Sequence, residues 1–188
     1  MDGTLVEPPL DFPTIRARLQ IPAGAGILEA IQAMPPDARA EARQILLEHE
    51  LAAAGKAQLM PGALQTLAAI RQAGLKTALL TRNAAAAMSI VIQRLGLKFD
   101  LAWSREQGPI KPEPDGVRRA CQALGLAAAR TLCVGDFEYD IVAANAAGAV
   151  SVLLSPSGQA AFSARPHHVI SALPQLLDLL GLADSEGH

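Results

Sequence analysis

Three acidic side chains and one lysine stand at positions from which they could act together on a phosphate group. Asp2 lies in the run Asp2-Gly3-Thr4-Leu5, and Asp136 and Asp140 share a Gly-Asp-x-x-x-Asp run. Carboxylates near one point make a hard oxygen site that suits Mg²⁺ and one phosphate oxygen. Lys111 would offset the negative charge of phosphate and carboxylates, so that a nucleophile is not repelled. These residue types predict phosphoryl transfer, which needs mainly positioning and charge neutralisation.

A second polar run, Thr81-Arg82-Asn83, follows an apolar stretch. The Thr81 hydroxyl and the amides at the start of a following helix would cradle the remaining phosphate oxygens. Asn83 is also predicted to cap that helix. Together with Lys111 these residues form the candidate substrate-binding set.

Each signal has a purely structural alternative when it is taken alone. The Asp2 run fits an ordinary turn, Thr81 fits a strand-end hydroxyl or a helix cap, and Lys111 fits a solvated loop lysine. Asp136 fits a helix cap, and Asp140 fits a first-turn partner of the helix dipole. Their joint occurrence, in this order and each at a strand end or loop, favours a common site.

The elements that position these residues alternate between strand-like and helix-like patterns. The helical stretches begin near Pro61-Gly62, Asn83, Glu113 and Tyr139 and end near glycines. The predicted strands lie at residues 77–80, 99–103, 131–134 and 150–154, with an edge strand at 168–170. This alternation predicts an α/β fold, a doubly wound and mostly parallel sheet, in which ligands collect beyond the carboxyl ends of the strands.

Residues 10–58 differ from the rest because they have no strand pattern. Pro35-Pro36-Asp37 looks like a helix start, and apolar residues follow it at helical spacing. We predict two or three short helices here, forming a small helical cap inserted into the α/β core. The core then comprises residues 1–9 and 59–183, and residues 184–188 form a flexible tail.

Composition narrows the possible partners. The 188-residue chain has a formal net charge of −2, about half its residues are apolar and few are aromatic. No basic tract favours nucleic acid or an anionic membrane as a partner, and no signal segment is apparent. Its two cysteines predict neither a disulfide nor a metal site and favour a reducing, cytoplasmic location. The oligomeric state is left open.

In chain order, the motifs resemble the four motifs of the haloacid dehalogenase-like (HAD) hydrolases. The matching positions are Asp2-Gly3-Thr4-Leu5, Thr81, Lys111 with Pro112, and Gly135-Asp136 with Asp140. The resemblance runs from Met1 to about Leu154, and the inserted helices resemble the small cap of the phosphoglycolate-phosphatase-like branch. The resemblance implies an Mg²⁺-dependent phosphatase of small phosphorylated metabolites.

The resemblance also implies a role for each matching residue. Asp2 would be the general acid/base, and Thr81 and Lys111 would act on the phosphate in the catalytic site. The metal site would comprise Asp2, Asp136 and Asp140. Asp140 would not contact the ion itself but would support the residues that do.

The family pattern places its nucleophilic aspartate two positions before Asp2, and therefore just upstream of Met1. We expect the reading frame to start upstream, so that the nucleophile and the first core strand, both missing from this chain, precede it. The 188-residue chain by itself is expected to be inactive. The alternative is a catalytically dead HAD-like protein that binds an anion or another protein. Dehalogenase or phosphomutase chemistry on the same fold is a third possibility, which the paired acids Asp136 and Asp140 disfavour.

Overall fold

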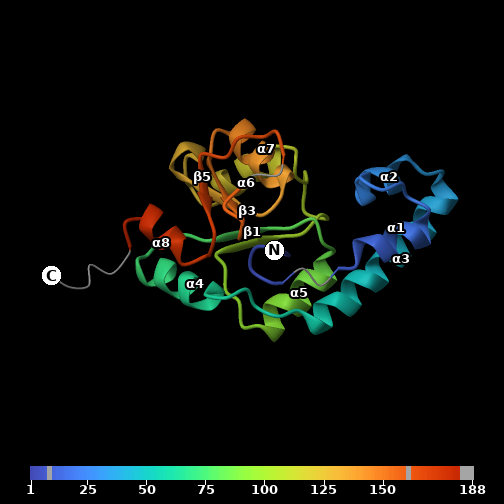
Figure 1. The fold of residues 1–188 in the computed structure, drawn as a ribbon, viewed down its shortest axis with the longest axis horizontal. Helices are drawn as coiled ribbons and strands as arrows, with labels where there is room; N and C mark the ends of the chain where they lie inside the picture. The colour runs from blue at the N-terminus through green and yellow to red at the C-terminus, as the bar shows by residue number, and fades with distance from the viewer. Residues whose placement is uncertain (8–9, 160–161, 183–188) are drawn as a thin grey trace.

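The computed structural model describes residues 1–7, 10–159 and 162–182. Within these ranges, parallel strands form a central layer with helices on both sides (Figure 1). The helices α6 (Asp115–Ala123) and α7 (Glu138–Ala147) lie on one side of the strands. On the other side lie α4 (Ala63–Gln72) and α5 (Ala85–Arg94). The predicted doubly wound α/β fold is confirmed.

The strands form two hydrogen-bonded sheets within the described residues. In the first, β1 (Ala78–Leu80) pairs in parallel with β2 (Leu101–Trp103). The second has the order β3 (Leu132–Gly135), β4 (Val150–Leu154), β5 (His168–Ile170), and all its pairs are parallel. The carboxyl ends of β1 and β3 lie at the same edge of the core, because Lys111 Nζ contacts both the Leu80 carbonyl at the end of β1 and Asp140 shortly after β3. Ligands are expected at this edge.

Residues 1–6 connect these two sheets at that edge. The segment folds as tight turns in which the amides of Leu5 and Val6 both bond to the Met1 carbonyl. Met1 and Val6 are buried in one apolar cluster with Leu79 of β1. Side chains of the same segment reach residues that follow β1 and β3, as described below. The turn at residues 1–6 is therefore held by contacts with both sheets.

Apolar packing divides the core into three clusters. One joins α5 to β1 through residues such as Val91 and Leu79. A second joins α4, β4 and the C-terminal helix α8 (Gln175–Leu179), with Val152 fully buried. A third packs α6 and α7 against Leu80 and Cys133. Burial of such side chains contributes about 1.5–3 kcal/mol each and is the main force that holds the layers together. A short 3₁₀ turn, Ala128–Arg130, precedes β3.

The inserted helices have a separate apolar cluster of their own. α1 (Phe12–Leu19), α2 (Ile27–Ala33) and the first half of α3 (Pro36–Lys56) pack around Ile15 and Ile31. The second half of α3 packs instead on α5 through Ala54. Two or three short helices were predicted here, but α3 is long rather than short because its buried positions continue through residue 54.

The division into cap and core at residues 58 and 59 stays a prediction, as does the second boundary at residues 9 and 10, where residues 8–9 are not described. The predicted flexible tail, 184–188, lies outside the described residues. None of the helices in the described ranges combines the length and the apolar character that crossing a membrane requires.

Candidate active site

The candidate site lies where four segments of the chain meet at the carboxyl edge of the sheets. Thr81 directly follows β1, Asp136 directly follows β3, and Asp140 lies in the first turn of α7. Lys111 comes from the loop between β2 and α6. Parallel strands bring such ends together even when the residues are far apart in sequence.

Lys111 is the central cation of this cluster. Its Nζ donates to the Leu80 carbonyl at 3.0 Å and forms an ion pair with Asp140 Oδ1. The other Asp140 oxygen accepts a hydrogen bond from the Phe137 amide at 3.1 Å. Burial acts to raise the pKa of Asp140, but the Lys111 ammonium acts against it, and the pKa ends below the ordinary value. Asp140 is therefore an anion that orients Lys111.

Asp136 is the second carboxylate of the site. Its Oδ1 accepts a hydrogen bond from the Thr4 hydroxyl at 2.8 Å. Burial raises its pKa above the ordinary value, while the Thr4 hydrogen bond opposes that rise and the neighbouring Asp140 adds to it. The raised pKa indicates a carboxylate whose charge is incompletely compensated by the protein.

Gly3 allows Asp136 to lie this close to the turn. Its φ is +72°, and a Cβ placed on it would come within 2.0 Å of Asp136 Oδ2. Only glycine fits here. Other residues rarely adopt this φ, and Asp136 leaves no room for a side chain at this position. The turn that presents Asp2 and Thr4 thus depends on Gly3.

Asp2 lies on the β1 side of the same site. Its Oδ2 accepts a hydrogen bond from the Asn83 side-chain amide at 2.7 Å. The Asn83 backbone amide bonds to the Thr81 hydroxyl at 3.2 Å. The prediction that Asn83 caps α5 is wrong, since the N-cap residue is Ala84, whose own side chain makes no capping hydrogen bond. Asn83 is used instead to hold Asp2.

The N-terminus of α5 is occupied by two carboxylates that the sequence patterns did not single out. Glu50 of α3 accepts a hydrogen bond from the Ala84 amide at 3.2 Å, and Glu106 accepts one from the Ala85 amide at 2.9 Å. Glu50 is almost fully buried, and it also pairs with Arg105. A sequence signal for it exists, because Glu50 falls four residues after Leu46 on the buried face of α3.

Arg82 connects the site to the inserted helices. Its guanidinium donates to the Lys111 carbonyl, pairs with Glu29 of α2 at 2.7 Å, and lies over the Tyr139 ring at 4.6 Å. A Cβ on Gly26, just before α2, would lie 3.3 Å from the Tyr139 hydroxyl. The inserted helices therefore reach the site at Arg82 and Tyr139.

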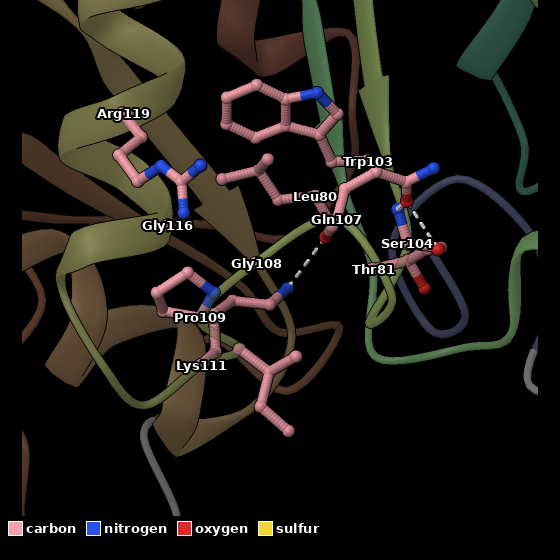
Figure 2. A pocket seen from close by; sticks show the side chains of 11 residues that line it. Leu80, Thr81, Trp103, Ser104, Gln107, Gly108, Pro109, Lys111, Gly116 and Arg119 are labelled. Atoms are coloured by element: carbon pink, nitrogen blue, oxygen red, sulfur yellow. Dashed lines mark hydrogen bonds between the residues drawn. The ribbon is translucent and has the colours of Figure 1, made fainter.

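A small cavity lies beside the cluster (Figure 2). Figure 2 shows Lys111 and Arg119 on one side of it and Thr81 and Ser104 on the other, with the Lys111–Leu80 hydrogen bond crossing between them. Its volume of about 20 Å³ is enough for one water molecule. It is too small to hold a metabolite.

The predicted site residues are thus brought together, although their roles are not tested by this geometry. Among the residues that the structure describes, no group of three or more His, Cys, Asp or Glu side chains is gathered to hold a metal. The assignment of Asp2, Asp136 and Asp140 to Mg²⁺ stays a prediction. Sequence reasoning missed Glu29 and Tyr139, for which no local pattern could signal a long-range contact.

Known proteins resemble this chain along most of its length. The model of the haloacid dehalogenase-like hydrolase family matches residues 1–148. A haloacid dehalogenase-like hydrolase domain-containing protein of Arabidopsis thaliana is 32% identical over 171 residues, which is 85% of this chain and 70% of that protein. A phosphoglycolate phosphatase of Neisseria gonorrhoeae is 33% identical over 127 residues, covering 61% of this chain and 52% of the relative.

Solved structures agree on the fold. A hydrolase from Pseudomonas syringae superimposes with a TM-score of 0.80 at 19% identity, covering 98% of this chain and 96% of that one. At this identity the likeness concerns the fold alone. The family match over residues 1–148 and the similarity to the plant protein show the family as well: the chain belongs to the haloacid dehalogenase-like hydrolase family.

Proposed function

We propose that this protein is an Mg²⁺-dependent phosphatase of small phosphorylated metabolites, phosphoglycolate among them. The observation that carries the proposal is the Lys111–Asp140 ion pair beside Asp136. Asp2 and Thr81 lie at the same edge of the core. A fixed cation next to carboxylates suits a phosphoryl group, whose charge must be neutralised during transfer. Similarity to the Neisseria phosphoglycolate phosphatase supports the substrate class.

The donor set fits a magnesium ion. Asp136 is a partly buried carboxylate with a raised pKa, and its Oδ2 faces Gly3, where no side chain intervenes. Hard oxygen donors of this kind are what Mg²⁺ prefers. The Asp136 carboxylate and the Asp2 backbone carbonyl would hold the ion, and Asp140 would support them while it orients Lys111. When bound, the ion supplies positive charge to the phosphoryl oxygens.

The remaining residues would bind and move protons. Thr81, Asn83 and Lys111 would bind the phosphate, and Arg82, which pairs with Glu29, would extend that set toward α2. Asp2 would protonate the leaving alcohol and then take a proton from the attacking water. The Asn83 amide at 2.7 Å fixes the Asp2 carboxyl for this work.

The family's aspartyl-phosphate intermediate requires one more carboxylate, which the family motif places two positions before Asp2. We propose that this residue is the nucleophile. Intact mass of the protein from its native cells tests the point. A mass above 19.6 kDa by about one strand's length would support the proposal. A mass equal to that value would favour a binding role instead.

The activity is tested by phosphate release from a panel of phosphomonoesters with the native protein. We expect turnover with Mg²⁺ and none after chelation. Asp2→Asn should lower kcat by about a hundredfold or more, since general acid–base catalysis contributes about 10²–10⁴. Glu138→Gln, one residue from Tyr139 and bonded to Ser163 rather than to the site, is the control. No release from any substrate with Mg²⁺ would refute the proposal.

A further inference from the structure

The Arg82 guanidinium is already held in the geometry that carboxylate recognition requires. The Lys111 carbonyl accepts from one of its nitrogens, and the Tyr139 ring lies 4.6 Å from its central carbon. These two contacts fix the plane of the guanidinium. Its Nη2 then faces Glu29 Oε1 at 2.7 Å. An arginine fixed in this way binds carboxylates well because its donors form a rigid fork.

The carboxylate that now pairs with Arg82 is half exposed and can therefore be displaced. The Glu29 side chain is 48% exposed, whereas the Arg82 side chain is only 20% exposed. Ion pairs with an exposed partner are weak, because water and salt compete with them. Two other cations near the site have buried partners: Lys111 pairs with Asp140, 13% exposed, and Arg105 pairs with Glu50, 3% exposed. Among these three cations, Arg82 is the one that can exchange its partner at low cost.

Arg82 also stands at the right place in the site. It directly follows Thr81, and its bond to the Lys111 carbonyl ties it to the residue whose Nζ faces Asp140. It lies at the boundary between the core and α2, toward which the alcohol part of a substrate would extend from a phosphate at Thr81.

We propose that Arg82 binds a carboxylate in the alcohol part of the substrate, and that Glu29 is the protein carboxylate which this group displaces. The substrate class is then small phosphomonoesters that carry a carboxylate close to the phosphate. This inference rests on the proposed phosphatase function and adds a specificity-determining pair to it. Displacement of Glu29 also removes the ion pair that joins α2 to the core, so substrate binding and the position of the inserted helices are coupled.

The test compares two substrates of similar size, 2-phosphoglycolate and 2-hydroxyethyl phosphate, in which an uncharged hydroxymethyl group replaces the carboxylate. We expect the native protein to have a KM for phosphoglycolate lower by about tenfold or more, the value of a hydrogen bond to a charged group. Arg82→Gln should reduce the ratio of the two KM values to about one. Arg82→Lys should restore part of the ratio, because it keeps the charge but not the fork.

Removing the competitor should act in the opposite direction. Glu29→Gln should increase the ratio by lowering the KM for phosphoglycolate. The matched control is Glu48→Gln, because Glu48 is 49% exposed and pairs with Arg18, another residue of the inserted helices, away from the site. A KM ratio that is the same in the native protein and in Arg82→Gln would overturn the proposal.

A binding measurement separates this inference from the phosphatase proposal. Glycolate, which has the carboxylate but no phosphate, and inorganic phosphate are each titrated while the arginine Nε–H resonances are followed by NMR. We expect glycolate to bind and to lose affinity in Arg82→Gln by more than inorganic phosphate does. Arg82-dependent glycolate binding without any turnover would refute the phosphatase and leave the carboxylate site. Equal glycolate binding in both proteins, or none in either, would refute the carboxylate site.

Discussion

The inserted helices contact the core through two ion pairs that differ sharply in their surroundings. At the far end of α3, Glu50 is buried, pairs with Arg105 and accepts the Ala84 amide. At the tip of the insertion, Glu29 of α2 is half exposed and meets Arg82. The first contact is held by several bonds out of water, and the second is open to solvent and exchange. One end of the insertion is therefore anchored, and the other is free to respond to what binds at the site.

The largest expected effect comes from breaking the anchored contact. Glu50→Ala should lower the free energy of unfolding by about 3–5 kcal/mol, because it leaves Arg105 and the Ala84 amide without their buried partner. Glu29→Ala should cost at most about 1 kcal/mol. Denaturant unfolding measures both changes. Equal losses in the two variants would mean that the two ends of the insertion are held alike.

A second prediction compares two glycines with similar backbone angles, one at the core and one in the insertion. Gly3 has φ +72°, and Asp136 Oδ2 lies 2.0 Å from the point that a Cβ on this residue would occupy. Gly24 has φ +83°, and no atom lies within 4 Å of the corresponding point. Substitution by alanine imposes a backbone cost of about 1–2 kcal/mol at each position.

Gly3→Ala should destabilise the protein further than this, because the new methyl group must push Asp136 away from Thr4. Thermal unfolding of the two alanine variants, measured side by side, gives the difference. If Gly24→Ala is as damaging as Gly3→Ala, crowding at Asp136 is not the cause.

The smallest expected effect is a pH dependence confined to the anchored contact. Burial raises the pKa of Glu50, although Arg105 opposes the rise. A raised carboxyl pKa contributes stability that is fully present below the unfolded value, 4.5, and is lost as the pH rises through the folded value. The stability of Glu50→Gln relative to the native protein should therefore increase as the pH rises from about 4.5.

This pH difference is measured by urea unfolding at several pH values. The control at the other end of the insertion is Glu29→Gln, compared with the native protein over the same pH values, because Glu29 is half exposed. A relative stability of Glu50→Gln that falls with rising pH would show that Arg105 outweighs burial.

The sequence predicts the arrangement of strand ends well, because periodic apolar runs and glycine stops are local signals. Thr81, Asp136 and Asp140 lie at the predicted ends for this reason. The partners of these residues could not be predicted, since they depend on how distant segments pack. Asn83 was predicted to cap a helix, and it binds Asp2 instead because residues 1–6 fold back over the end of β1. Even β2, predicted from a weak pattern, is defined by its pairing with β1.

Contacts between helices of the insertion and the core are still less visible in the sequence. Glu29 resembles any exposed helix carboxylate until α2 is placed near Arg82. Glu50 is different, since an acid on the buried face of a helix predicts a buried partner. That partner, Arg105, is 55 residues away and has no local signature.

The turn at residues 1–6 has a consequence for how the protein assembles. Its side chains join residues separated by 81 positions, Asp2 and Asn83, and by 132 positions, Thr4 and Asp136. Contacts of such long range form late, because the chain must first lose the freedom of the intervening loops. Helices and strands can therefore be present well before the carboxylates are aligned. During refolding, recovery of the site should lag behind recovery of secondary structure, so that activity reports the completed molecule rather than its parts.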